Sequence, residues 1–193
     1  VWLMMALTGE CPPVALIIHR RPLHTARVFK AISQARPQRL FVIGDAARAE
    51  VAGEHELVLA ARAITEQIDW PCEVTRSYSQ HNLGAGSRVI TGLDQVFAEV
   101  DHAVVLEDDC VPDMTFFSYT QELLHRYALD PKVMTIGGHL SHLPDHHTND
   151  SYWFSRYPAT WGWATWADRW WRRADAMNQW PRLREGGWLA SAV

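Results

Sequence analysis

Three consecutive carboxylates, Glu107, Asp108 and Asp109, directly follow the apolar run 103–106. Two like charges about 4 Å apart repel by about 4 kcal/mol at an effective dielectric near 20, so such a cluster needs a cation, hydrogen-bond donors or open water. Carboxylates suit Mg²⁺ or Mn²⁺, which also bind water and substrate phosphates. The cluster therefore predicts a metal–nucleotide site. The alternative is that Glu107 and Asp109 are solvated turn residues and that Asp113 caps the next helix.

Two other apolar runs also end in polar groups. Arg20 and Arg21 end the run that begins at Pro13, and Asp45 ends the run that begins at Arg39. In open α/β sheets, ligands bind outside the carboxyl ends of the strands, so the three polar strand ends predict one shared site. Arginines at these ends, together with Arg88, are expected to clamp phosphate.

Strand-like and helix-like segments alternate along the chain and must position these groups. Strands are expected within 13–22, 39–48, 72–78, 102–109 and 132–138, with 151–158 as a further candidate. Helices are expected within 23–36, 47–67, 87–100, 112–130 and after Gly162. This alternation predicts an α/β fold with a largely parallel sheet flanked by helices.

The composition is that of a globular domain. The chain has 193 residues, of which 48% are apolar and 21% charged, which suffices for one domain with a sizeable core. A net charge of -4 indicates no basic face, so nucleic acid is not expected as a partner. Residues 1–12 are expected to be an N-terminal extension that need not be ordered, and residues 13–193 to form the domain.

The three cysteines, Cys11, Cys72 and Cys110, are scattered and odd in number. They form no metal-binding pair and no disulfide framework, which favours a reducing compartment. The apolar stretch 1–7 is too short to span a bilayer. We therefore expect a cytoplasmic protein without a transmembrane segment, or one at the inner face of a membrane.

Several segments, taken in order, resemble GT-A-fold glycosyltransferases, specifically a bacterial sugar-nucleotide transferase group and N-acetylglucosaminyltransferase I. The resemblance runs from about Pro13 to Trp188. It implies a Rossmann-like sheet, a nucleotide-sugar donor with UDP favoured, and a divalent cation. The matching segments are "IIHRRPLHTARVFKAI", "RLFVIGDAAR", "HNLGAGSRVITGLDQVF", "LEDDCVPDMTFFSYTQELLHRY" and "SRYPATWGWATWADRW".

The resemblance also implies roles for the matching residues. Asp109 would be the direct protein ligand of Mn²⁺ or Mg²⁺, and the diphosphate and water would complete the coordination. The nucleotide-sugar positions would be Arg21 at the diphosphate, Asp45 at the uracil ring or its equivalent, Asn82, Gly84 and Arg88 beside the nucleotide, and Glu107 and Asp108 near the donor sugar and ribose.

Eight of the ten tryptophans lie between Trp153 and Trp188. Aromatic rings pack on the flat faces of sugars, and they also fill cores. Helical spacing predicts the core for Trp166, Trp170 and Trp171. The resemblance implies that Trp161, Gly162 and Trp163 belong to the nucleotide-sugar site. The two tryptophans would contact the donor and acceptor there, with the core as the open alternative for both rings. The histidine-rich stretch 139–147 is expected to be a surface or acceptor-side loop rather than a zinc site.

Inverting transferases use an Asp as the general base. The resemblance implies that this Asp lies in a W-D-x-x-W segment beyond Val193, so the domain is expected to be incomplete at its C-terminus. Asp168, Asp175 and Glu185 are expected to be surface charges.

The sequence thus predicts a metal-dependent, inverting hexosyl- or N-acetylhexosaminyltransferase. Its acceptor is left open between a glycan, a lipid-linked molecule and a protein. The alternative is a truncated or degenerate domain that binds nucleotide without transfer. A phosphohydrolase is disfavoured because the pattern D-x-D-x-[TV] is absent.

Overall fold

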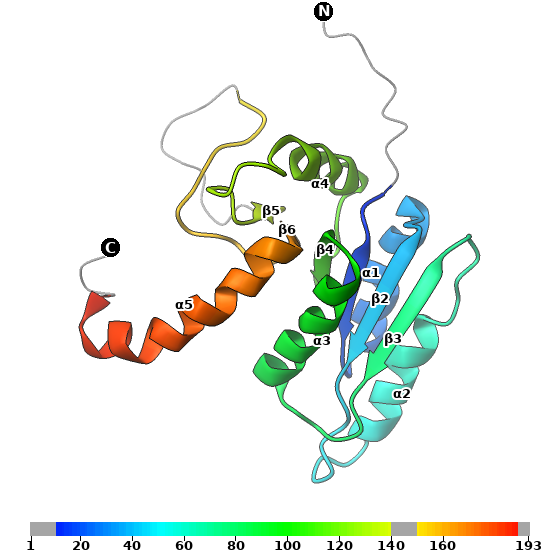
Figure 1. Cartoon of the computed structure of the whole chain (residues 1–193). Helices are drawn as coiled ribbons and strands as arrows, with labels where there is room; N and C mark the ends of the chain where they lie inside the picture. Colours follow the sequence, from blue (N-terminus) through cyan, green and yellow to red (C-terminus); the bar gives the residue numbers. More distant parts are fainter. Residues whose placement is uncertain (1–10, 140–149, 189–193) are drawn as a thin grey trace, which may run out of the picture.

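The computed structural model describes residues 11–139 and 150–188, and its centre is a six-stranded sheet in the order β3-β2-β1-β4-β6-β5 (Figure 1). Strands β3, β2, β1 and β4 are parallel, whereas β6 runs antiparallel to both β4 and β5. The strands are β1 (Val14–Ile18), β2 (Arg39–Gly44), β3 (Glu73–Tyr78), β4 (His102–Glu107), β5 (Ile136–Gly137) and β6 (Trp163–Trp166).

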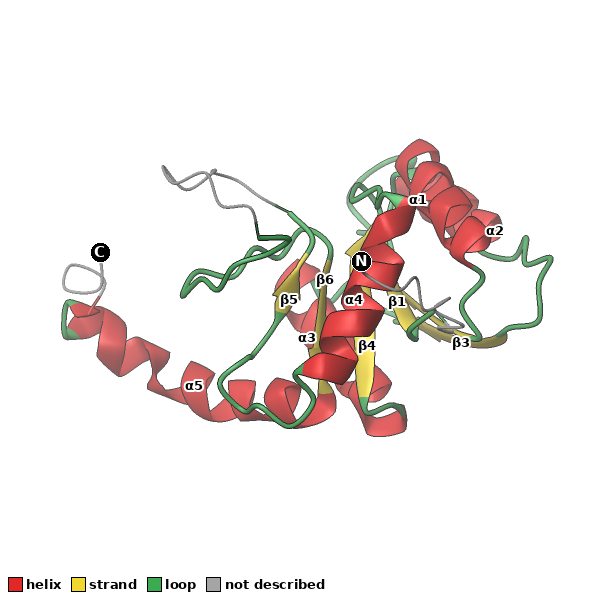
Figure 2. Ribbon diagram, turned by 90° about the horizontal axis from the view of Figure 1, so that it is seen from above, coloured by secondary structure: helices red, strands yellow, loops and turns green. Residues whose placement is uncertain are grey.

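Helices cover both faces of the sheet (Figure 2). They are α1 (Pro22–Ala35), α2 (Glu54–Ile64), α3 (Ala85–Glu99), α4 (Met114–Arg126) and α5 (Ala167–Glu185). Local chemistry fixes two of the helix starts. Pro22 stands in the first turn of α1, where its missing N–H costs nothing. Asp113 caps α4 by accepting a hydrogen bond from the backbone N–H of Thr115 at 2.9 Å. The α/β class, with a largely parallel sheet flanked by helices, is confirmed.

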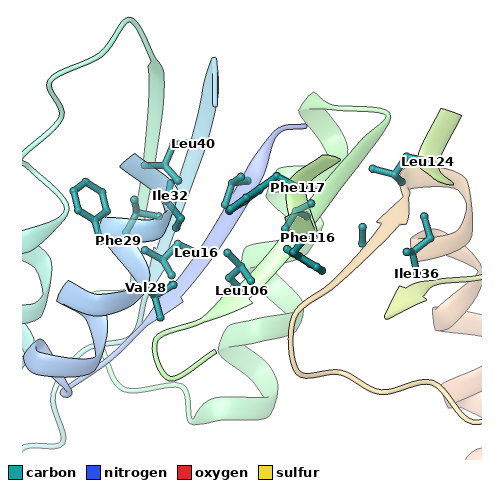
Figure 3. Close-up of a cluster of buried hydrophobic side chains, with 14 of the residues drawn as sticks. Leu16, Val28, Phe29, Ile32, Leu40, Leu106, Phe116, Phe117, Leu124 and Ile136 are labelled. Atoms are coloured by element: carbon teal, nitrogen blue, oxygen red, sulfur yellow. The ribbon is translucent and has the colours of Figure 1, made fainter. Parts of the chain in front are cut away.

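The inner strands are apolar on both sides, as expected for a parallel sheet that is buried on both faces. Alternate side chains of these strands therefore pack into two separate cores, one on each face of the sheet. The core on one face is shown in Figure 3. It contains Leu16, Leu40 and Leu106 of the strands, Val28, Phe29 and Ile32 of α1, and Phe116, Phe117 and Leu124 of α4. The core on the other face contains Ala15, Phe41, Ile43 and Val105 of the strands, Leu93, Val96 and Phe97 of α3, and Trp170 of α5.

The sheet register brings the carboxyl ends of the parallel strands to one edge. Ile18 is paired with Gly44, and Gly44 with Tyr78. Glu107 is paired with Ile17, one residue before the end of β1. The polar groups that follow β1, β2 and β4 therefore lie at the same edge of the sheet, and a shared binding site there stays a prediction.

The prediction of a helix after Gly162 is wrong for the first four residues. Residues Trp163–Trp166 form strand β6, and α5 begins only at Ala167. The four residues extend the sheet beyond β4, and their alternate side chains pack into opposite cores: Ala164 and Trp166 into one, Trp163 against the other. The backbone hydrogen bonds of the β4 edge are thereby satisfied, and so short a segment carries no helical period of its own.

Three smaller predictions are wrong in part. Residues 151–158 contain no strand, and the expected strand 132–138 shortens to the two residues of β5. The helix expected over 47–67 begins at Glu54, directly after Gly53 in the left-handed conformation. Trp166 and Trp170 are buried as predicted, but Trp171 is 45% exposed, because it lies on the outer face of α5.

Candidate functional site

A cavity of about 400 Å³ lies at the carboxyl ends of β1, β2 and β4, and we call it the strand-end cavity. Its volume is within the range usual for small-molecule sites. It brings together most of the residues that the sequence suggested for nucleotide-sugar binding. Those lining it are Arg21, Asp45, Asn82, Gly84, Arg88, Glu107 and Asp108.

Arg21 bridges the carboxylate cluster. Its guanidinium group donates to Asp108 Oδ1 and, at 2.7 Å, to Asp109 Oδ2. Asp108 is buried, whereas Arg21 and Asp109 are exposed. The hydrogen bond to Asp108, followed by the nearby negative charges, raises the pKa of Arg21 above its usual value. The guanidinium group of Arg21 is therefore a cation that neutralises part of the carboxylate cluster, as the electrostatic argument requires.

Glu107 is the carboxylate of the cluster that the bridge leaves out. It is half-buried at the end of β4. Burial raises its pKa, and the negative charges of Asp109 and Asp108 add to this effect. The neighbouring carboxylates thus disfavour a further negative charge on Glu107, and a bound cation would relieve this repulsion.

Asp45 holds the loop that precedes α3. Its carboxylate accepts hydrogen bonds from the Ser79 hydroxyl at 2.6 Å and from the backbone N–H groups of Ala46, Leu83 and Gly84 at 2.9 to 3.1 Å. Burial acts to raise the pKa of Asp45, but these donors outweigh it and keep the pKa below its usual value. The side chain that the resemblance assigns to the base therefore fixes the loop that forms one wall of the cavity.

Arg88 is buried on the same side of the cavity. It donates to the carbonyl oxygens of Gly44 at 3.0 Å and Ser77 at 2.5 Å, and to the Ser77 hydroxyl at 2.6 Å. Burial lowers the pKa of Arg88. Most of its donors are committed to the ends of β2 and β3, so it shapes the site more than it offers free donors. Asn82 Nδ2 similarly donates to the carbonyl oxygen of Ala46 at 2.7 Å.

Sequence reasoning missed a second charged group at the strand-end cavity. Glu54, in the first turn of α2, is 1% exposed and contacts His19, Arg20 and Arg48. Arg48 could have been found, because it follows the end of β2 just as the arginines follow the end of β1. Nothing in the local pattern around Glu54 distinguishes it from an ordinary acidic residue at a helix start.

The structure has a second, larger cavity of about 1590 Å³, which we call the aromatic cavity. Asp109, Trp161 and Gly162 line it. Trp161 is 61% exposed, and its ring centroid lies 4.8 Å from that of His139. Other rings on the wall come from Tyr119, Tyr127, Tyr152, Trp153, Phe154 and Tyr157.

Trp163 is placed differently from its neighbours Trp161 and Gly162. Its ring packs beside Trp170, with centroids 6.4 Å apart, against the core formed with α3. It lines neither of the two cavities. Of the histidine-rich stretch, only His139 lies within the described residues.

The residues present suit one kind of metal site. Within residues 11–139 and 150–188, no group of three or more His, Cys, Asp or Glu side chains could hold a metal ion. Asp109 is exposed and lines the aromatic cavity, and it directly follows Glu107 and Asp108, which line the strand-end cavity. One such carboxylate fits Mg²⁺ or Mn²⁺, which keep several waters and take further oxygens from phosphates. It does not fit a structural zinc ion, which requires four protein ligands.

Two further observations concern the whole described chain. None of its helices is both long and apolar enough to cross a membrane. All three cysteines are free thiols.

No protein-family model matches the chain, and no curated protein matches it. Among solved structures, the mannosyltransferase PcManGT from Pyrobaculum calidifontis, in complex with GDP-Man and Mn²⁺, is similar with a TM-score of 0.45 and 16% identity. The match covers 67% of this chain and 36% of that one. A UDP-glucose pyrophosphorylase complexed with UDP-glucose is similar with a TM-score of 0.36 and 11% identity, over 65% of this chain and 56% of that one. At these scores and identities, neither neighbour assigns a function to this chain.

Proposed function

We propose that the strand-end cavity binds a nucleoside-diphosphate sugar and that the chain is a GT-A-type glycosyltransferase domain. One observation carries this proposal. Seven side chains or backbone positions suggested for the nucleotide sugar come from separate segments of the sequence, and they line one cavity. That cavity lies at the carboxyl edge of a parallel sheet, where α/β proteins bind ligands.

The residues of the cavity have different roles in the proposed binding of the nucleotide. Asp45 holds the loop that forms the wall for the base, and Gly84 allows the backbone to turn there with a φ of 77°. Arg21 exchanges its carboxylate partners for the diphosphate, because both are anions that accept from its planar guanidinium group. A UDP-sugar is the donor that the resemblance favours.

Asp109 is proposed as the protein ligand of Mn²⁺ or Mg²⁺. A divalent cation, when bound, neutralises the charge of the diphosphate and of the leaving group. Glu107 and Asp108 are proposed to lie near the donor sugar and ribose. Asp109 faces the aromatic cavity, and we place the acceptor there because exposed rings such as Trp161 can pack on the apolar faces of a sugar.

The second candidate function is nucleotide binding without transfer. Asp108 and Asp109 hold Arg21, and Asp45 holds the loop before α3. Neither these carboxylates nor Glu107 is proposed as the general base that inverting transfer requires. The two candidates agree on the donor site and differ only in turnover.

The test separates binding from turnover. Calorimetric titration of the chain with UDP and with GDP, in the presence of Mn²⁺, is expected to show binding of at least one. Incubation with a panel of UDP- and GDP-sugars, followed by quantification of released nucleotide, then shows whether the bond to the sugar is cleaved. Binding without release would favour the second candidate. A chain that binds neither nucleotide would contradict both.

A further inference from the structure

A buried carboxylate lies beneath the strand-end cavity and is surrounded by cationic side chains. Glu54 Oε2 accepts from Nε of Arg48 at 2.9 Å and from the backbone N–H of the same residue at 3.1 Å. Glu54 Oε1 lies 3.1 Å from Nη2 of Arg48, 3.3 Å from Nη1 of Arg20 and 3.1 Å from Nε2 of His19. Three groups from two strand ends thus converge on one side chain.

The charges of this group do not balance. Glu54 supplies one negative charge, whereas Arg20 and Arg48 supply two positive charges. A buried carboxylate is costly to desolvate, and the hydrogen bonds from Arg48 keep the pKa of Glu54 down at about 2, so it stays ionised. The surplus positive charge lies on the cavity side, because Arg20, Arg48 and His19 line the cavity and Glu54 does not.

Arg20 and Arg48 also have N–H donors that Glu54 does not use. Their side chains are 46% and 40% exposed, and a guanidinium group carries five N–H donors, of which Glu54 takes only some. The other ring nitrogen of His19, Nδ1, is buried and makes no hydrogen bond to any of the described residues. This group therefore presents preoriented N–H donors and one surplus positive charge to a cavity that Asp45, Glu107 and Asp108 also line.

We propose that Arg20 and Arg48, held in place by Glu54, form an anion-binding pair that takes the phosphates of the nucleoside diphosphate. The inference rests on the proposed nucleotide site and adds Arg48 as a binding residue and Glu54 as a positioning residue. Fork-shaped donors suit phosphate oxygens, and prior fixation by a buried carboxylate reduces the entropy lost on binding. The pair should therefore favour a diphosphate over a monophosphate.

The test uses calorimetric titration of the whole chain with UDP, with UMP and with inorganic pyrophosphate. Arg48→Ala is expected to weaken UDP binding by about tenfold, the loss of one charge-assisted contact, and to weaken UMP binding less. Arg48→Lys keeps the charge but cannot form the fork, so it should recover part of the loss. Arg27→Ala, an exposed arginine of α1 away from the cavity, is the matched control and should change neither affinity.

Glu54→Gln tests the positioning role. The substituted side chain would lie below the surface as Glu54 does, so a purely structural role would lower UDP and UMP affinity together. If Glu54 positions the arginines, Glu54→Gln should instead lower the ratio of UDP to UMP affinity. Arg20→Ala changes an exposed side chain and should lower the same ratio, so it tests the pair even if Glu54→Gln does not fold.

The outcomes separate this inference from the proposed function. If the wild-type chain binds UDP and the ratio of UDP to UMP affinity is unchanged in Arg48→Ala and Arg20→Ala, the anion pair is wrong and the nucleotide site stands. If the chain binds pyrophosphate through Arg48 but neither UDP nor GDP, the anion pair stands and the nucleotide site is wrong. Binding of none of these ligands overturns both.

Discussion

Arg21 is bound to the carboxylate that is proposed as the ligand of the metal ion. The guanidinium group of Arg21 contacts Asp108 and Asp109, and Asp109 is the proposed ligand of the divalent cation. Any metal ion that binds Asp109 must therefore displace this internal cation. The same side chain is proposed to bind the diphosphate. Its removal should therefore strengthen the binding of the metal ion and weaken the binding of the nucleotide.

The first prediction concerns the variant Arg21→Ala. Removal of the bridge should tighten the binding of Mn²⁺ alone by about three- to tenfold, since a partly exposed ion pair contributes about 1 kcal/mol. UDP should bind more weakly in the presence of Mn²⁺, because a phosphate contact is lost. Free Mn²⁺ is measured by electron paramagnetic resonance, with Arg27→Ala as the control. A parallel loss of both affinities would show that Arg21 does not compete with the metal.

The second prediction follows from Glu54. The hydrogen bonds from Arg48 lower the pKa of Glu54 from 4.5 to about 2, so its ionised form stabilises the folded state. This contribution is complete above pH 4.5, and it is lost as pH falls from 4.5 toward 2. Urea midpoints of the wild type and Glu54→Gln should therefore differ most above pH 4.5 and converge below it. A difference that does not change with pH would contradict the assignment.

At the scale of elements, the loop before α3 depends on one glycine. Gly84 has φ 77° and ψ 155°, a conformation that residues with a Cβ rarely adopt. A Cβ placed at Gly84 meets no atom within 4 Å, so a substitution there tests the backbone conformation alone. Gly86, in the first turn of α3, also has open space around it but lacks a positive φ.

The third prediction is a matched pair of variants at these two glycines. Gly84→Ala should destabilise the fold by about 1–3 kcal/mol and weaken UDP binding, because the loop anchored by Asp45 is strained. Gly86→Ala should stabilise it by about 0.4–1 kcal/mol, because it reduces the freedom of the unfolded chain. Chemical denaturation measures both. Equal effects of the two substitutions would show that the loop does not need the special conformation of Gly84.

The packing of α3 against the sheet gives a fourth prediction. A Cβ at Gly92 would lie 2.4 Å from Cγ2 of Ile43, which belongs to β2. Gly92→Ala should therefore push α3 away from the sheet and cost about 1–3 kcal/mol of stability. The double variant Gly92→Ala with Ile43→Val, measured by urea denaturation, should recover part of the loss. No recovery would place the origin of the cost elsewhere.

At the scale of the whole molecule, the sequence predicted what depends on local periodicity. Alternating apolar runs and helical stripes located the strands and helices of the sheet core. The rule that parallel strands present their carboxyl ends to one edge then predicts that Arg21, Asp45 and Glu107 lie close together. These predictions succeed because each rests on a few neighbouring residues.

The features that the sequence did not predict depend on distant partners. Strand β6 exists because the edge of β4 accepts it, and four residues carry too little pattern to show this. Glu54 is buried because residues after β1 and β2 surround it, although its own surroundings in the sequence resemble any helix start. The commitment of Asp45 to its loop likewise became visible only with side-chain geometry.

The central claim is that the strand-end cavity binds a nucleoside diphosphate with a divalent cation at Asp109. It is tested most directly by titrating UDP and GDP into wild type and Asp109→Ala, with Mn²⁺ and with a chelator. Asp101→Ala, an exposed carboxylate just before the opposite end of β4, is the matched control. We expect Mn²⁺ to strengthen nucleotide binding about tenfold or more in wild type and in Asp101→Ala, and to have no effect in Asp109→Ala. Equal enhancement by Mn²⁺ in all three proteins would contradict the assignment of Asp109, and no nucleotide binding in any of them would contradict the site itself.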